Sequence, residues 1–258
     1  MAKRNRDTLK HFFRKGSLPS EDQFHDLIDS AVNQIDEGFD KSPDNGLEIT
    51  PVGSGDSLIS FFRSRAPERP IWSINYSGTG DGLFFNNQTH HFTPLVLSPD
   101  GKVGINNKTP KWDLDVDGVI AATGRIGVYR QGLVPADGEW HNLTDELSGV
   151  HAFEIIAGAG KIKTGRYALI HAFALNCFNP FGWFFNFLNR KKAIDSRQAY
   201  YRSMSDKLKL RWHGVNKKYY LQVKSNSDYG DGTQISYYLT RLWFDEDMSS
   251  SWRSPEQK

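Results

Sequence analysis

The stretch from residue 102 to residue 118, KVGINNKTPKWDLDVDG, constrains the fold more than any other part of the chain. It contains two short β-patterned runs, Val103–Ile105 and residues 112–116, joined by a segment rich in turn-forming residues. Apolar and acidic side chains alternate in the second run, so Trp112, Leu114 and Val116 fall on one face of a strand. That face requires burial, whereas the opposite face, which carries aspartates, requires water.

The wording of this stretch resembles a short repeat near the junction of shaft and head in phage tail fibres and related fibre proteins. The chain has S-P-D-G-K-V-G-I, then T-P, then L-D-V-D-G-x-I, where the family has V-G-I-G-T-x-x-P followed by L-x-V-x-G-x-I. The chain departs from that pattern at Asn106, where the family usually has glycine, and at Lys111 and Trp112, where it has small or polar residues. The resemblance implies a subunit of a homotrimeric fibre.

The aspartates of the same stretch allow a second interpretation, because D-x-D-x-D-G opens an EF-hand calcium loop. That loop needs a bidentate glutamate at its twelfth position, which in this chain is Gly124. The flanking residues also lack the pattern of amphipathic helices. We therefore expect an exposed acidic strand face and no metal site.

Composition favours a β-rich chain without a membrane span. Aromatic residues make up 13% of the sequence, and strands accommodate them better than a helical bundle does. The net charge of +2 gives no indication of nucleic-acid binding. No apolar run has the length of a secretory signal or a membrane span, which predicts folding in the cytoplasm. The single cysteine, Cys177, lies in an apolar run and is expected to be a small buried side chain.

Residues 1–40 are predicted to form an attachment or trimerisation segment. Residues 1–16 carry six basic residues against one acidic residue, which indicates a basic arm. Ser20 is placed to cap a helix that Gly38 ends. One short helix cannot bury its apolar stripe by itself, so the stripe requires a neighbouring surface. The stripe consists of Phe24, Leu27, Ile28, Ala31 and Ile35.

The same helix resembles the P-T-x-x-Q-F-x-x-L-I-D-S segment near the N terminus of fibre-like proteins from phages and contractile injection systems. The resemblance implies that this segment attaches to a baseplate or tail protein, or forms the trimer. The matching positions are Pro19, Gln23, Phe24, Leu27, Ile28, Asp29 and Ser30.

Residues 41–126 are predicted to form a β-rich shaft. Short apolar runs alternate there with segments rich in Gly, Pro, Ser and Asn, which is typical of short strands and tight turns. With so few long apolar runs the shaft has difficulty closing a core alone, and threefold association would supply the missing contacts. The expected strands are residues 47–49, 57–62, 71–76, 83–85 and 95–97.

From residue 127 the apolar runs become longer, which predicts a C-terminal head domain over residues 127–258. Such strands favour an antiparallel, jelly-roll-like β-sandwich. The expected fold is thus mainly β, with a short N-terminal helix, an intertwined trimeric shaft and this head. The expected head strands are residues 150–157, 167–178, 208–212, 218–223 and 234–244, with turns at 158–160 and 163–165 and a hairpin turn at 228–232.

Residues 179–201 are predicted to form a long loop, and long loops on rigid β scaffolds commonly carry binding sites. Residues 189–224 hold eleven Lys and Arg residues against two Asp residues, a patch suited to phosphates, an acidic glycan or a neighbouring subunit. Aromatic rings stack on sugar faces. The candidate receptor-binding residues are therefore Trp183, Tyr200, Tyr201, Trp212 and Tyr229.

The sequence shows no arrangement of catalytic residues, no metal-ligand spacing and no cofactor motif, so we do not expect an enzyme. The expected function is that of a structural fibre subunit of a phage tail or contractile injection particle. It attaches by its N terminus and binds a glycan or protein receptor on a target surface with its C-terminal domain. It is assembled in the cytoplasm and works in an extracellular particle or virion. A non-adhesive baseplate or collar connector is the alternative, and a polysaccharide depolymerase is a third hypothesis.

Overall fold

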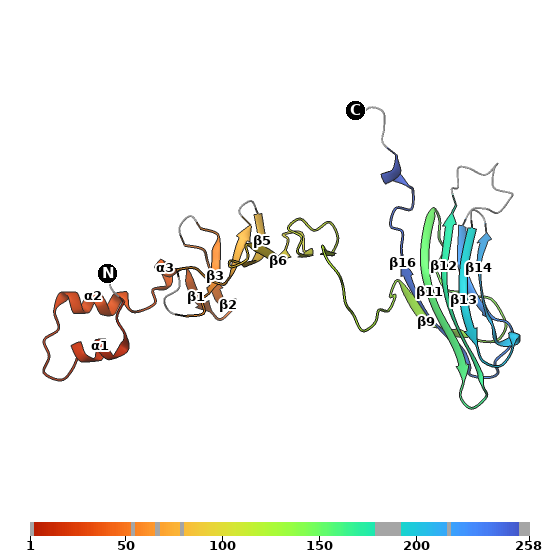
Figure 1. Cartoon of the computed structure of the whole chain (residues 1–258), viewed down its shortest axis with the longest axis horizontal. Helices are drawn as coiled ribbons and strands as arrows, with labels where there is room; N and C mark the ends of the chain where they lie inside the picture. Colours follow the sequence, from red (N-terminus) through yellow and green to blue (C-terminus); the bar gives the residue numbers. More distant parts are fainter. Residues whose placement is uncertain are drawn as a thin grey trace. The chain divides into compact units, whose positions relative to one another are not determined.

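The computed structural model describes residues 3–52, 55–64, 68–77, 80–178, 192–215 and 218–252. The chain divides into two compact units, Met1–Ala121 and Ala122–Lys258. Strands dominate, in several antiparallel sheets, and two short helices lie near the N terminus (Figure 1), so the mainly β class is confirmed. Within the described residues, no helix is both long enough and apolar enough to cross a membrane.

The first helix, α1 (Arg6–Phe12), lies where the sequence predicted a basic arm. It begins after Asn5, whose side-chain Oδ1 accepts a hydrogen bond from the N–H of Thr8 at 2.9 Å. This cap satisfies one of the N–H groups that a helix leaves free at its start. The prediction missed the helix because it weighed the charge of residues 1–16 and overlooked the cap.

The second helix, α2 (Glu21–Asp29), begins after Ser20 as predicted but ends well before Gly38. The intervening residues 30–33 include Ser, Val and Asn, which are weaker helix formers. A separate single turn, α3 (Gln34–Glu37), follows. The predicted helix is therefore two pieces.

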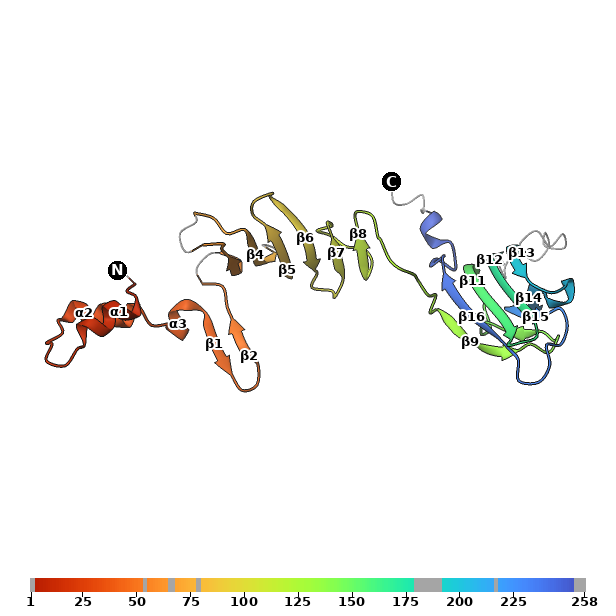
Figure 2. The same ribbon diagram turned by 60° about the horizontal axis from the view of Figure 1, so that its bottom comes forward.

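A hairpin and a six-stranded sheet make up the rest of the first unit (Figure 2). In the sheet each strand lies beside the next one in the sequence, and every neighbouring pair is antiparallel except the last, which is parallel. The predicted positions of these strands are confirmed except for β1, which was not predicted. The hairpin is β1 (Phe39–Ser42) and β2 (Gly46–Ile49); the sheet is β3 (Ser57–Phe61), β4 (Trp72–Ser77), β5 (Gly80–Asn87), β6 (Phe92–Leu97), β7 (Val103–Ile105) and β8 (Leu114–Val116).

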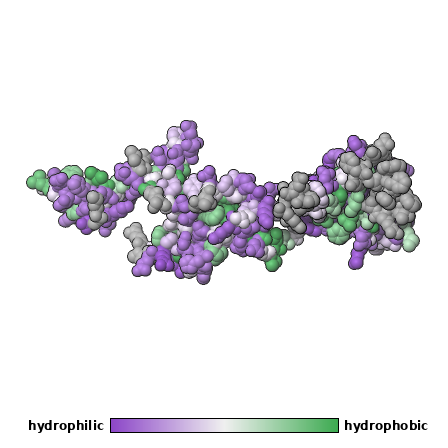
Figure 3. All heavy atoms as spheres, turned by 90° about the horizontal axis from the view of Figure 1, so that it is seen from above, coloured by the Kyte–Doolittle hydropathy of each residue, from purple (hydrophilic) through white to green (hydrophobic). Residues whose placement is uncertain are grey.

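The first unit has almost no apolar core of its own. Among the buried apolar side chains of the described chain, Val96 is the only one that belongs to this unit. Trp112 and Leu114, predicted to lie on the buried face of the second run, are 64% and 60% exposed. Figure 3 shows green, apolar side chains at the surface of this unit among purple, polar ones. The apolar faces of the sheet are therefore not covered by the chain that carries them.

The second unit contains two antiparallel sheets that enclose one core (Figure 1). The five-stranded sheet has the order β13-β12-β11-β16-β9, and the three-stranded sheet has the order β10-β15-β14. The strands are β9 (Arg130–Pro135), β10 (His141–Asn142), β11 (Val150–Lys161), β12 (Arg166–Cys177), β13 (Lys192–Tyr200), β14 (Leu208–Val215), β15 (Lys218–Ser225) and β16 (Gln234–Arg241). Two short 3₁₀ turns, η2 (Met204–Asp206) and η3 (Ser249–Ser251), complete the unit.

Alternation along the strands decides which side chains enter this core. On β15 the side chains of Tyr219, Leu221 and Val223 are at most 1% exposed, because alternate residues of a strand share one face. They meet inward-facing residues of β11, among them Phe153 and Ile155, which are fully buried. The core is thus a layer of large side chains between the two sheets.

Three predicted details of the head are wrong. Residues 158–160 were expected to form a turn, but β11 continues through them to Lys161. Residues 228–232 were expected to close a hairpin, but the strands before and after them belong to different sheets. Residues 192–200, expected to lie in a long loop, form β13 at the edge of the larger sheet. Residues 158–160 and 192–200 are strands because they pair with β12, and residues 228–232 connect the two sheets.

Candidate functional site: an aromatic hollow on the five-stranded sheet

The floor of the candidate site is a row of side chains, all small except Leu169, that crosses four strands on the outer face of the larger sheet. Strand register places Leu169 of β12 opposite both Ala199 of β13 and Gly158 of β11. Gly158 is in turn opposite Ser236 of β16. Because this row contains glycine, alanine and serine, the sheet surface is hollowed here.

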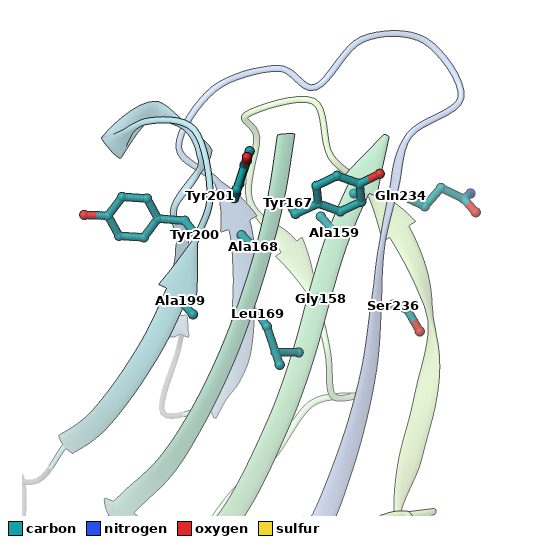
Figure 4. A pocket seen from close by; sticks show the side chains of 11 residues that line it. Gly158, Ala159, Tyr167, Ala168, Leu169, Ala199, Tyr200, Tyr201, Gln234 and Ser236 are labelled. Carbon is teal, nitrogen blue, oxygen red and sulfur yellow. The ribbon is translucent and has the colours of Figure 1, made fainter. Parts of the chain in front are cut away.

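Two tyrosines form the rim of the hollow. Tyr167 lies opposite Gly160, and a Cβ at that glycine would come within 2.5 Å of the tyrosine ring, so the ring rests directly on the glycine. The backbone N–H of Tyr201 donates to the carbonyl of Tyr167 at 3.0 Å, which holds the two residues side by side. Figure 4 shows both rings at the same end of the hollow. Tyr201 is 81% exposed and Tyr167 is 44% exposed, so both rings are accessible.

The hollow has a volume of about 650 Å³ and is lined by aromatic, small apolar and neutral polar side chains. The neutral polar groups include Gln234 and Ser236, and no described lining residue is charged. A volume of this order is typical of sites for small ligands. Aromatic rings, an amide and hydroxyl groups together suit a neutral ligand that offers several hydroxyl groups, such as a sugar.

A buried polar network holds the rim in place. Arg166, the residue before Tyr167, donates from Nε to Oδ1 of Asp206 at 2.8 Å, and Asp206 is 1% exposed. The same guanidinium donates to the Asp228 carbonyl and to the Ser227 hydroxyl, each at 2.7 Å. Arg166 therefore ties the start of β12 to η2 and to the connection between β15 and β16.

Two predicted receptor-binding residues, Trp212 and Tyr229, lie in the core and do not face solvent. Tyr229 is 2% exposed, its hydroxyl donates to the Asp206 carbonyl, and burial raises the pKa of that hydroxyl to about 12. Trp212 is 9% exposed and packs on Tyr219 with ring centroids 5.3 Å apart. Neither ring is accessible for stacking on a ligand, because inward-facing positions of β14 and the inter-sheet connection carry them into the core.

The remaining predicted receptor-binding residues lie in different places. Tyr201 lies on the rim of the hollow. Tyr200 also lines the hollow, but its ring points away from those of Tyr167 and Tyr201 (Figure 4), packs against the core and lies under the Lys207 ammonium group at 5.0 Å. Trp183 lies outside the described residues. The structure thus brings together Tyr200 and Tyr201 and adds Tyr167, which the sequence analysis did not select.

Four of the five predicted attachment residues are exposed. Phe24, Leu27 and Ile28 of α2 are 49%, 39% and 66% exposed, and Phe24 contacts the ring of Phe13 at 5.3 Å. Ala31 is exposed beyond the end of the helix. Ile35 lies in α3, and its side chain is outside the described part of the structure.

Cys177 is exposed rather than buried, because it occupies an outward-facing position of β12. Among the described residues no group of three or more His, Cys, Asp or Glu side chains is arranged to hold a metal ion. Asp115, one of the aspartates of the calcium-like motif, accepts a hydrogen bond from the Lys111 N–H at 2.8 Å.

The sequence analysis missed the hollow because it assigned Gly158 and Gly160 to a turn. The available signal was the spacing of these two glycines, which places both on one face of a strand. No protein-family model matches the chain, and no curated protein matches it either.

Proposed function

We propose that the chain is a structural subunit of a fibre on a phage tail or contractile injection particle and works as a homotrimer. The observation that carries this proposal is the contrast between the two units. Among its described residues the first unit has a single buried apolar side chain, Val96, whereas the second has a full core between two sheets. An ordered sheet with so little core requires partner chains, and intertwined copies of the same chain would supply them.

The two sequence resemblances support the same proposal and indicate which end of the chain attaches to the particle. The N-terminal stripe of Phe24, Leu27 and Ile28 would attach to a baseplate or tail protein, because these side chains are exposed and unburied within the chain. The shaft would lead to a C-terminal β-sandwich head. Such a protein is assembled in the cytoplasm and acts outside the cell as part of the particle.

The head would bind a glycan on the target surface through the aromatic hollow. Tyr201 and Tyr167 provide exposed rings for the sugar face, and Gln234 and Ser236 provide hydrogen-bonding groups. Since no described lining residue is charged, a neutral sugar fits the hollow better than the acidic glycan that the basic patch of residues 189–224 indicated.

A glycan array probed with the full-length protein tests this role. We expect selective binding that Tyr201→Ala reduces at least tenfold, because an exposed stacking ring is lost. Trp252→Ala is the control, since Trp252 is a 72% exposed aromatic residue of the same unit that does not line the hollow. A blank array, together with tight binding to a purified particle, would favour the non-adhesive connector and would remove the glycan site.

A further inference from the structure

Strand β12 carries its larger apolar side chains on the outside of the head. Its inward-facing residues include Ala168, Ala172 and Ala174, which are at most 5% exposed. The outward-facing positions instead carry Leu169, Phe173 and Leu175, which are 57%, 44% and 47% exposed. An antiparallel sheet with one face in water normally alternates apolar inward and polar outward residues. Strand β12 thus has the pattern of a strand that is covered on both faces.

Neighbouring strands add two more exposed apolar side chains to this face, where the register places Glu154 beside Phe173 and His171 beside Ile156. Ile156 of β11 is 41% exposed, and the register places it beside Tyr238 of β16, which is 37% exposed. Single exposed apolar residues are ordinary, but several large ones on one face of a sheet indicate an interaction surface. We call this patch the outer apolar face; it consists of Ile156, Leu169, Phe173, Leu175 and Tyr238.

The charges on the outer apolar face are balanced in sign. Glu154 is 7% exposed and is paired with Arg125 and with His171, whose Nε2 lies 2.9 Å from Oε1 of Glu154. On the edge strand β13, Asp195 lies opposite Phe173 and Arg197 lies opposite His171. Neither Asp195 nor Arg197 has an ion pair with any described residue. A face with one unpaired charge of each sign complements another copy of itself.

We propose that the outer apolar face contacts the same face of other copies of this chain, and that these contacts form the subunit interface of the head. The inference rests on the proposed trimer and places the face toward its threefold axis. Asp195 of one copy pairs with Arg197 of the next, and Phe173 and Leu175 are buried between copies. An acidic or basic partner fits less well, because the face offers neither sign in excess.

The proposed contact between copies lies beside the aromatic hollow and does not cover it. The hollow begins at the row of Leu169 and ends at the rim of Tyr167 and Tyr201, whereas Phe173 lies four positions along β12 from Leu169. Four residues of a strand span about 13 Å. Only Leu169 is shared, so subunit contact and glycan binding are separable by mutation.

The native Cys177 reports whether the face is covered, because it is exposed in the single chain and follows Leu175 on the same side of β12. The experiment measures, on the full-length protein, the absolute mass by light scattering and the rate at which a charged maleimide labels Cys177. We expect a trimer in which labelling is slow. Phe173→Glu should accelerate labelling at least tenfold, since it places a charge in the contact. Ile162→Glu, at an 81% exposed residue beyond the face, should leave the rate unchanged.

A charge exchange tests the contact without removing an apolar side chain. Asp195→Arg should accelerate labelling, because it sets like charges against each other across the contact. Adding Arg197→Asp should restore slow labelling, because the exchanged pair is again complementary.

The outcomes separate this inference from the proposed function. The interface would be overturned, and the trimeric fibre left in place, by a trimer whose Cys177 is labelled rapidly. A trimer whose labelling rate is unchanged by both Phe173→Glu and Asp195→Arg would have the same meaning. A wild-type monomer would overturn both. Unchanged circular dichroism of each variant excludes misfolding as the cause of faster labelling.

Discussion

At the scale of single residues, the head is stabilised by a few buried polar groups whose partners are well defined. Asp206 joins η2 to Arg166, and the Tyr229 ring lies under the same guanidinium at 4.2 Å. The Asp206 side chain is almost fully buried and the Arg166 side chain is partly buried, with exposures of 1% and 19%. The network therefore positions the residue that precedes the rim of the hollow.

Removing the carboxylate of this pair should destabilise the head strongly. Asp206→Ala leaves the Arg166 charge without its buried partner, and breaking a buried pair in this way costs about 3 kcal/mol. We expect a lower free energy of unfolding of the full-length protein. Urea titrations monitored by tryptophan fluorescence measure it. Asp231→Ala, at an exposed carboxylate, should change it little. Equal effects of the two substitutions would show that the ion pair between Arg166 and Asp206 does not stabilise the head.

Acidification should destabilise the head through His151. This side chain is 2% exposed, and burial lowers the pKa of its imidazole below the ordinary value of 6.5. On acidification the unfolded chain therefore takes up a proton first. The contribution of neutral His151 to the stability of the folded state is complete above pH 6.5. It is lost as the pH falls through the lower pKa of the folded state. Melting temperatures measured between pH 7.5 and pH 5 should decline for the wild type and more shallowly for His151→Gln, whereas the exposed control His11→Gln should follow the wild type.

At the scale of elements, strand β11 both contributes to the core and forms the hollow. Its inward residues Phe153 and Ile155 are fully buried, and its outward glycines leave the sheet surface open. Gly158 adopts ordinary strand geometry, and a Cβ there would lie 3.3 Å from Leu169 Cδ1. A β-branched residue is compatible with a strand, so the glycine is not required by the backbone.

Filling the floor should abolish ligand binding without unfolding the head. Gly158→Val places a branched side chain in the hollow while it favours the extended backbone. We expect the melting temperature to stay within about 3 °C of the wild type, which corresponds to about 1 kcal/mol. Binding to the glycan identified on the array should be lost. Retained binding would show that the ligand lies elsewhere on the head.

The sequence predicted the strands of the first unit other than β1, and the positions of β12 and β15, because these depend on local pattern. It did not predict β13, nor the continuation of β11 through Gly158 and Gly160, because those strands exist through pairing with β12 rather than through their own composition. For the same reason Tyr229 could not be told apart from Tyr201 in advance. Both are tyrosines in turn-rich surroundings, and only the three-dimensional packing buries the first and exposes the second.

At the scale of the whole molecule, the two units differ in what they need from other chains. The second unit buries a core between its own sheets. The first orders a six-stranded sheet around Val96 alone and leaves Trp112 and Leu114 largely exposed. A protein that exposes so much apolar surface along one unit would aggregate as a monomer or bury that surface by association. Closed threefold association is the solution that our account proposes.

The absolute mass in solution tests this central claim most directly. Light scattering on the full-length protein, measured across a concentration series, is predicted to give three times the 29.3 kDa mass of the single chain. The value should not change on dilution, because the shaft of each copy depends on the other two. A stable monomer of 29.3 kDa would contradict the trimeric fibre and, with it, the covered outer face of the head.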